Sequence, residues 1–459
     1  MSPSLMSQSL LMEAQSLRAE GDLNGSIALL RVVISQCNAD ADRGRLLANN
    51  ELWRMASYQL ALLLLQNSGR SDDQTSEQEA DAILQKLGYK LRLSTKAFGY
   101  PSCECTLKSS VESERSNDMD LPLLLKDNFL PQSIFSALKQ SLRPTSRYWT
   151  EFYTKTMSEN GEKRTFASHN IPLPNSSESD FIECTQKANS LIEQVAIIVK
   201  QFVSQQFPSI CTATSVEVWA HKRTPDAHHQ LHYDTDELKL QSMRSTRKGN
   251  KKRKHGSDEE EWSRRGSNGL CPMVSCVLTI QVPQEGNGSR LGKGAPTLVC
   301  NQSLLGGRSN EGWLCYPRQN RLVAFDGSLL HAVVPGIPSD LSEDDGHDTR
   351  ITLMMGFWKE VTLTVPDKTS TSLTIGPNLP FPSRLLDDFK PMVLENNILS
   401  MHTPTPTHPI PVKPLWVEIK ENYAIKSVKT DTTNDEDFSG RFFLKTTEPT
   451  DIDKEVLGL

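Results

Sequence analysis

Residues 228–237 read HHQLHYDTDE and contain the triplet His232-Tyr233-Asp234. A second histidine, His331, follows after a long interval, within RLVAFDGSLLHAVV at residues 321–334. Two imidazoles and one carboxylate form a three-point iron site that leaves half of an octahedron open for other ligands. The sequence therefore predicts a metal site made of His232, Asp234 and His331.

The segments around both histidines have the composition of β-strands separated by turns. The run VEVWA at 216–220 precedes the first histidine, and 321–334 contains two strand-like segments around Gly327. Further strands are predicted at 274–282 and 350–358. The metal site is therefore expected to lie within a β-sheet core.

This ordered set resembles the Fe(II)- and 2-oxoglutarate-dependent dioxygenases, in particular the prolyl-hydroxylase-like members. That family carries His-X-Asp, a long interval, a distal His, and then a basic residue that opens the next strand, a place filled here by Arg350. In the family this Arg pairs with the far carboxylate of 2-oxoglutarate, and a hydroxyl two residues on, here Thr352, assists it. A guanidinium suits the task because it binds a carboxylate through two parallel hydrogen bonds and stays charged.

The resemblance covers roughly residues 120–365 and implies an α+β fold, with a double-stranded β-helix (jelly-roll, cupin-like) core and flanking helices. It implies Fe(II) as cofactor, 2-oxoglutarate and O2 as co-substrates, and hydroxylation of a C–H bond with release of succinate and CO2. Asp234 favours oxygen insertion, because the family's halogenating members carry a small residue there. The interval between His331 and Arg350 is longer than usual, and we assign the excess to a polar loop at 337–348 that bulges from a hairpin.

The substrate stays open at this point. The helical amino-terminal part favours a protein side chain, whereas a small metabolite and an alkylated nucleobase are alternatives within the same reaction class. A non-catalytic scaffold with the same β-helix is an alternative from another class. A metal-binding cupin of different chemistry would keep the histidines without needing Arg350.

Simpler roles exist for each of these side chains. Histidines and Asp234 can be satisfied by hydrogen bonds or cap a turn, and Arg350 can form an ion pair. The neighbouring polar residues lack the ligand spacing or lie beyond the strand, so we do not expect them to bind metal or act as catalytic acids. These residues are His228, His229, Asp236 and Glu237.

The chain divides by composition into four parts. Residues 1–108 are helical and weakly similar to tetratricopeptide (TPR) repeats, with helices joined at Gly21, and form either a partner-binding module or a cap on the core. The other parts are a linker at 109–119, the dioxygenase-like domain at 120–365 with a disordered charged insertion at 241–268, and a Pro/Thr-rich extension at 366–459.

Two further elements are predicted inside the dioxygenase-like part. A short strand near 121–126 is followed by a helix with Pro131 at its head. The apolar periodicity from Phe181 to Phe202 predicts one amphipathic helix over the sheet.

With 459 residues and a net charge of −6, the chain can bury a large core, and nothing in its overall charge selects a nucleic acid or a membrane as partner. The start of the chain lacks the features of a secretory signal, and the nine cysteines fit free thiols. A cytoplasmic or nuclear location is expected, and the basic run Lys251–Lys254 resembles a nuclear-import signal.

Overall fold

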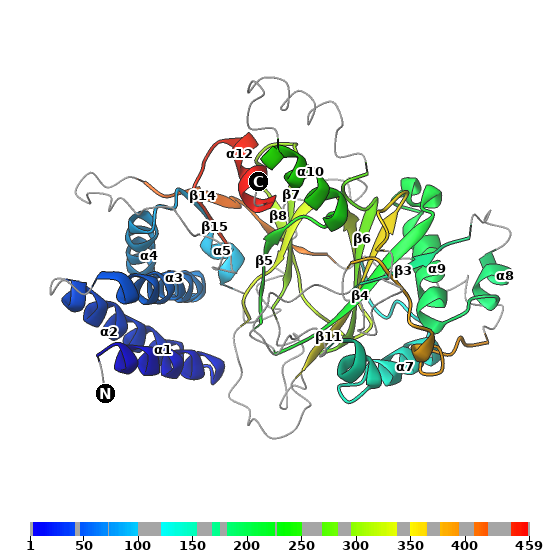
Figure 1. Cartoon of the computed structure of the whole chain (residues 1–459), viewed down its shortest axis with the longest axis horizontal. Coiled ribbons are helices and arrows are strands. Elements are labelled where there is room, and N and C mark those ends of the chain that lie inside the picture. Colours follow the sequence, from blue (N-terminus) through cyan, green and yellow to red (C-terminus); the bar gives the residue numbers. More distant parts are fainter. Residues whose placement is uncertain are drawn as a thin grey trace.

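The computed structural model places helices at one end of the chain beside a two-sheet core (Figure 1). Every structural statement below concerns the residues that it describes. These are 3–41, 46–71, 73–99, 121–153, 168–174, 181–224, 227–249, 269–282, 295–336, 349–364, 377–393, 408–420 and 442–457.

The larger sheet has the strand order β12-β3-β4-β11-β6-β9-β2. Its strands pair antiparallel except for β12 and β3, which are parallel. The bounds are β2 (Leu123–Lys126), β3 (His169–Pro172), β4 (Ser215–Arg223), β6 (Val274–Gln281), β9 (Leu322–Asp326), β11 (Arg350–Trp358) and β12 (Leu379–Pro380).

The smaller sheet has the order β13-β8-β7-β10-β5 and faces the larger one. Apolar side chains from both sheets, among them Val299, Leu329 and Phe325, join in one buried cluster between them. The bounds are β5 (His229–His232), β7 (Thr297–Ser303), β8 (Gly312–Cys315), β10 (Leu329–Val333) and β13 (Ile410–Val412).

The central strand β11 is buried along its whole length, which explains why most of its residues are apolar. It lies between β4 and β6, and all nine of its residues are buried. Ile351, Leu353, Met355 and Phe357 belong to the core on the helix side, because successive side chains of a strand point to opposite faces. The residues in between face the space between the two sheets.

Helices cover the outer face of the larger sheet (Figure 1). The predicted helix from Phe181 to Phe202 is two helices, because Ser190 starts a new one: its hydroxyl accepts from the Glu193 N–H at 3.1 Å. Pro131 precedes α7, as predicted. The bounds are α7 (Gln132–Ser141), α8 (Phe181–Gln186), α9 (Leu191–Val203), the π-helical turn η3 (Tyr148–Tyr153) and the 3-10 turns η6 (Pro208–Thr212) and η7 (Ser383–Leu385).

Two expectations about loops need correction. The segment expected to be a disordered insertion begins in α10 (Glu237–Gly249), whose apolar Leu240 is buried, and only 250–268 lies outside the described residues. The segment 337–348 also lies outside them, but it cannot bulge from a hairpin. Strands β10 and β11 belong to different sheets, so the chain crosses between the sheets here.

The amino-terminal part contains the predicted helices, and Gly21, at φ +88°, separates the first two. TPR character stays a prediction. None of the helices in the described part of the chain combines the length and the hydropathy needed to cross a bilayer. The bounds are α1 (Pro3–Ala19), α2 (Leu23–Ala41), α3 (Leu46–Ser71), α4 (Gln74–Lys86) and α5 (Thr95–Phe98).

Parts of the carboxyl-terminal segment pack onto these helices and onto the smaller sheet. A third sheet has the order β14-β1-β15, so two late strands flank an early one. The rings of Phe442 and Phe443 contact those of Tyr58 and Phe98. The bounds are β1 (Leu91–Leu93), β14 (Trp416–Glu418), β15 (Phe443–Leu444) and α12 (Pro449–Leu457).

One close approach in the amino-terminal part requires glycine on both sides. Gly69 in α3 and Gly99 after α5 touch through their backbones, and a Cβ on either would overlap the other. We expect Gly99→Ala to destabilise the chain by about 1–3 kcal/mol, the usual cost of overpacking. Thermal unfolding followed by circular dichroism measures this, with exposed Lys96→Ala as the control. An unchanged melting temperature for Gly99→Ala would contradict the contact.

Candidate metal centre

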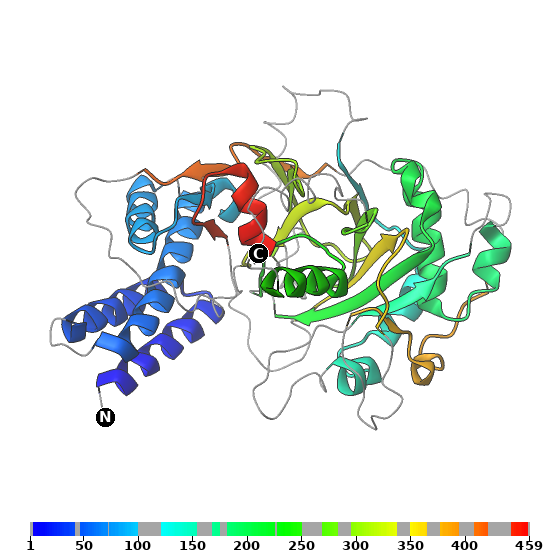
Figure 2. The ribbon, with the colours of Figure 1, turned by 45° about the horizontal axis from the view of Figure 1, so that its top comes forward.

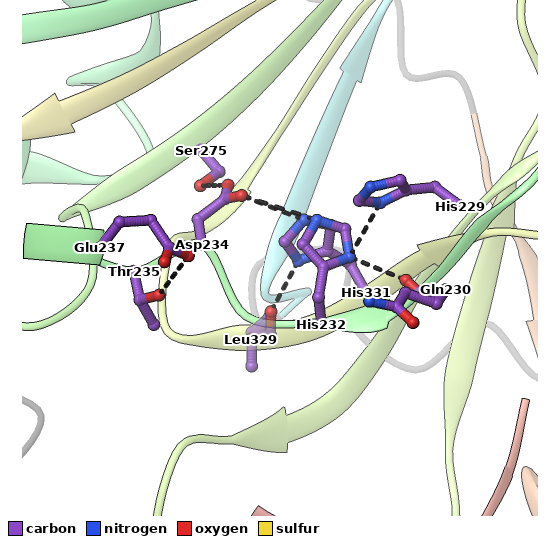
Figure 3. Close-up of polar contacts among 9 residues, drawn as sticks. All are labelled: His229, Gln230, His232, Asp234, Thr235, Glu237, Ser275, Leu329 and His331. Atoms are coloured by element: carbon purple, nitrogen blue, oxygen red, sulfur yellow. Dashed lines mark hydrogen bonds and ion pairs between the residues drawn. The ribbon is translucent and has the colours of Figure 1, made fainter. Parts of the chain in front are cut away.

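The predicted ligands come from two neighbouring strands and the loop that follows one of them. His232 is the last residue of β5 and pairs directly with His331 of β10. Asp234 lies two residues after His232 in the loop that follows β5, and its carboxylate faces both imidazoles. Side chains of directly opposed residues in an antiparallel pair lie close together. The strand register therefore brings all three together (Figure 3).

The three side chains point their polar atoms at one another. Asp234 Oδ1 lies 3.5 Å from Nε2 of His331 and 3.7 Å from Nε2 of His232. The two imidazole ring centres are 4.2 Å apart. Among the described residues, these three form the group of His, Cys, Asp and Glu side chains whose ligand atoms all lie within 4.8 Å of one another.

The backbone fixes the orientation of both imidazoles. His232 Nδ1 lies 2.8 Å from the Gln230 carbonyl, and His331 Nδ1 lies 2.9 Å from the Leu329 carbonyl. A carbonyl oxygen only accepts, so each Nδ1 carries a proton, and each Nε2 is left facing Asp234. Such outer hydrogen bonds are the usual way in which proteins orient metal-binding histidines.

Asp234 is oriented from the other sheet. Its Oδ2 accepts a hydrogen bond of 2.7 Å from the Ser275 hydroxyl on β6, which leaves Oδ1 facing the histidines. Both sheets therefore contribute to the site.

Electrostatics favour the forms that bind a cation. Burial and the nearby His331 lower the pKa of His232 to about 4, so this imidazole is neutral at pH 7. Burial would raise the pKa of Asp234, but the two histidines and Ser275 outweigh it and hold the pKa below its ordinary range. Burial would lower the pKa of His331, but Asp234 raises it overall. A divalent cation would take the place of the His331 proton beside Asp234.

The donor set fits iron. Two imidazole nitrogens and one carboxylate oxygen on one side of a metal leave the remaining positions open, as in non-haem Fe(II) oxygenases. The Nε2 atoms of the two fixed rings and the ionised carboxylate meet at one point. The site thus suits a divalent transition metal better than Ca²⁺ or Mg²⁺, which prefer oxygen ligands.

The site opens into a cavity of about 560 Å³ between the two sheets. This volume is in the range of small-molecule sites. Arg350 and Thr352, both buried, line it from β11. In the neighbouring β4, Arg223 pairs with Arg350, so two guanidinium groups make this end of the cavity basic. His221 pairs with Thr352 beside them, and burial keeps the pKa of this imidazole well below its ordinary value.

Both guanidinium groups at this end are held by backbone carbonyls. Arg350 Nη1 donates to the carbonyl of Ala295, and Arg223 Nη1 donates to that of His228 at 2.8 Å. Each guanidinium presents five N–H donors, and these contacts fix where the group lies at this end of the cavity. A carboxylate fits this end of the cavity.

The opposite end of the cavity holds a buried carboxyl group. Glu217 accepts hydrogen bonds from the Ser168 hydroxyl and, at 3.2 Å, from Trp358 Nε1. Burial raises the pKa of Glu217 to about 7, and the charge of Asp234 adds to this rise. The folded protein therefore favours the neutral form of this group.

This raised pKa predicts a pH-dependent stability. The ordinary pKa is 4.5, so between pH 4.5 and about 7 the folded state holds a proton that the unfolded state has lost. The stabilisation from Glu217 is thus full below pH 4.5 and is lost as the pH rises to about 7. Glu217→Gln removes the charge and keeps one of the two acceptor oxygens, and we expect it to raise the melting temperature of metal-free protein at pH 8 more than at pH 5. Exposed Glu360→Gln is the control, and equal shifts at both pH values would contradict the prediction.

The four neighbouring polar residues named in the sequence analysis are not among the grouped metal ligands. His229 lines the cavity, and its Nδ1 lies 3.2 Å from His232 Nδ1, but it is not one of the three grouped side chains. Asp236 accepts from the Lys239 and Thr362 backbone amides at 2.9 and 2.7 Å, so it fixes the start of α10. Glu237 lies on the cavity wall, and His228 contacts the ring of Phe442.

Several cavity residues were missed from the sequence. His221 and Arg223 follow the predicted strand 216–220 at its own two-residue period, which would have placed them on the cavity side. Ser275 begins a predicted strand, but nothing local indicates its contact with Asp234. No signal near the metal motif indicates that α12 forms part of the cavity wall.

No protein-family model matches the sequence, and no curated protein matches it. Among solved structures, the chain is similar to a prolyl-4-hydroxylase from Pseudomonas putida, with 15% identity, a TM-score of 0.28, and coverage of 52% of this chain and 90% of that one. It is also similar to HygX from Streptomyces hygroscopicus with iron bound, at 11% identity and a TM-score of 0.25, with coverage of 58% of this chain and 94% of that one. A HygX structure with nickel and 2-oxoglutarate bound gives 12% identity and a TM-score of 0.23, with coverage of 57% of this chain and 92% of that one. These values indicate only a distant relationship.

Proposed function

We propose that this chain is an Fe(II)- and 2-oxoglutarate-dependent dioxygenase that hydroxylates a C–H bond. The observation that carries the proposal is the convergence of His232 Nε2, His331 Nε2 and Asp234 Oδ1 in a cavity. Both rings are fixed through Nδ1, so each Nε2 faces the Asp234 carboxylate at the point where a metal would bind. A scaffold protein would have no need of such an arrangement.

The topology supports the same assignment. Strands β4, β6, β9 and β11 lie in the larger sheet, and β5, β7, β8 and β10 lie in the smaller one. The first of these eight strands lies beside the last in the order β4-β11-β6-β9, and the second lies beside the seventh in β5-β10-β7-β8. This is the connectivity of a double-stranded β-helix, or jelly roll.

The basic end of the cavity supports 2-oxoglutarate as co-substrate. The Arg350 guanidinium would bind the far carboxylate, and the Thr352 hydroxyl, on the same face of β11, would donate to it. Iron held by the triad would supply O2 activation, coupled to decarboxylation of 2-oxoglutarate to succinate and CO2.

For the primary substrate we propose a protein side chain. The cavity is bordered by two helices, through Leu240 of α10 and Leu457 of α12, so its wall includes segments outside the two sheets. A peptide side chain entering between such helices would reach the metal while the rest of the peptide stays outside. A metabolite or an alkylated nucleobase would instead have to fit inside as a whole.

The test is anaerobic addition of Fe(II) and 2-oxoglutarate to the metal-free protein. Chelation of iron by 2-oxoglutarate gives a visible metal-to-ligand charge-transfer band, which we expect only when both are present. Iron with succinate is the matched control, because succinate lacks the keto group. A folded protein without this band, and without iron-dependent succinate release in air, would refute the proposal in favour of a scaffold. If the band appears, peptide and metabolite pools then distinguish the substrate classes by stimulated succinate release.

A further inference from the structure

The carboxyl-terminal helix α12 lies against the metal-binding motif although it follows it by more than two hundred residues. Tyr233, the residue between two of the ligands, donates its phenol hydrogen to Asp453 Oδ1 at 2.6 Å. Both residues are buried, with exposed fractions of 4% for Tyr233 and 3% for Asp453. A short hydrogen bond between a buried phenol and a buried carboxyl group is strong, because the alternative is an unsatisfied polar group.

Asp453 also ties the helix to the smaller sheet. Its second oxygen, Oδ2, accepts from the backbone N–H of Leu305 at 2.7 Å, in the turn after β7. Leu305 has φ of +63°, a conformation that L-residues rarely adopt, so this turn is held in place by its contacts. Asp453 thus connects the loop of the metal motif to a fixed turn of the core.

The same helix forms part of the cavity wall. Val456 and Leu457 line the cavity beside the metal-binding residues, and Leu457 is buried. Figure 2 shows α12 beside α10 at the front of the two-sheet core. The carboxyl-terminal segment is therefore close to the candidate site on two independent counts, a hydrogen bond to the motif and a contact with the cavity.

We propose that Asp453 is a positioning residue for the metal centre: through Tyr233 it fixes the His232–Asp234 segment in its metal-binding conformation. The motif needs this support because Asp234 lies in a loop after the end of β5, where strand pairing no longer fixes the backbone. Tyr233 lies between the two ligands, so anchoring its phenol restrains the backbone from which both ligand side chains extend. The inference rests on the metal site of the proposed function and does not depend on the reaction or the substrate.

The test measures Co(II) affinity and the visible Co(II) spectrum of the full-length protein, with His331→Ala as the baseline for binding elsewhere. Outer contacts of metal ligands typically contribute 10–100-fold to affinity, so we expect Tyr233→Phe and Asp453→Ala to weaken binding by about tenfold. Asp453→Asn retains one hydrogen bond to Tyr233 or Leu305 and should restore part of the affinity.

A matched control separates positioning from general loosening of the tail. Tyr58 accepts a hydrogen bond of 3.2 Å from the Phe442 backbone N–H, so it also anchors the carboxyl-terminal segment, but through a hydrogen bond that involves neither Tyr233 nor Asp453. Tyr58→Phe should leave the Co(II) affinity and spectrum unchanged, whatever it does to the melting temperature. Equal weakening by Tyr58→Phe and Tyr233→Phe would overturn the proposal, and so would wild-type affinity in both Asp453 variants.

If the variants fail to fold, a measurement on the wild-type protein still tests the proposal. If α12 supports the metal motif, Co(II) binding must in turn stabilise α12, because coupling between two sites is reciprocal. Amide hydrogen exchange in 449–457 should slow when Co(II) is added, whereas exchange in α1 should not change. Unchanged exchange in α12 despite Co(II) binding would overturn the proposal. A wild type that binds no metal would instead count against the proposed function.

Discussion

Asp234→Ala is expected to abolish Fe(II)-dependent turnover and the charge-transfer band while the chain stays folded. Asp234 supplies the negative charge among the three ligands, and its Oδ1 is the atom that faces both imidazoles. Without it, a cation would meet two neutral nitrogens in a buried site, and the charge of Fe(II) would lack compensation. Iron titration, the anaerobic spectrum and succinate release measure the loss, and His331→Ala should behave in the same way.

A second carboxylate in the same loop provides the control. Asp236 lies two residues further on and is also buried, but its oxygens accept from the backbone amides of Lys239 and Thr362. Asp236→Asn should therefore keep iron binding and succinate release, even if it lowers the melting temperature. Normal succinate production by Asp234→Ala and His331→Ala together would exclude this site as the metal centre.

The strands that form this site could be predicted from the sequence because their signals are local. Apolar runs and turn residues placed a strand at 350–358 and two strands around Gly327, and β9, β10 and β11 lie there. The resemblance of the His-X-Asp and distal His pattern to a known metal motif predicted His232, Asp234 and His331 as a group, and the structure brings them together. That convergence follows from the register of β5 against β10, which the sequence does not state.

The contacts that support the ligands could not be predicted in the same way. Ser275 and Asp453 reach the motif from distant segments, and a single sequence contains no record of which distant side chains meet. The break between α8 and α9 depends on the local cap at Ser190, which a periodicity of apolar residues does not detect. The charged residues that begin the segment 241–268 led to a prediction of disorder, but part of that segment lies in α10. A helix at the surface needs only one buried face, so charged residues on its other face do not prevent it from forming.

The second large effect concerns the co-substrate. We expect Arg350→Ala to raise the 2-oxoglutarate concentration needed for half of the charge-transfer band by about 10–100-fold, since a buried guanidinium–carboxylate contact contributes about 1.5–3 kcal/mol. The Arg350 side chain is buried at the basic end of the cavity and donates a hydrogen bond to the Ala295 carbonyl. Metal affinity should change little, because Arg350 is not among the three grouped ligands. Arg350→Lys should give an intermediate loss, because an ammonium group cannot bind a carboxylate through two parallel hydrogen bonds.

Arg223 is the decisive comparison, because it pairs with Arg350 across β4 and β11 and lines the same end of the cavity. If Arg350 is the anchor, Arg223→Ala should raise the 2-oxoglutarate requirement less than Arg350→Ala, through loss of the nearby positive charge alone. Spectroscopic titration of both variants with 2-oxoglutarate at saturating Fe(II) measures the difference. A larger effect of Arg223→Ala would move the carboxylate anchor to β4 and leave the iron site as described. Wild-type titrations for both variants would place 2-oxoglutarate elsewhere in the cavity, because no carboxylate could then be bound at its basic end.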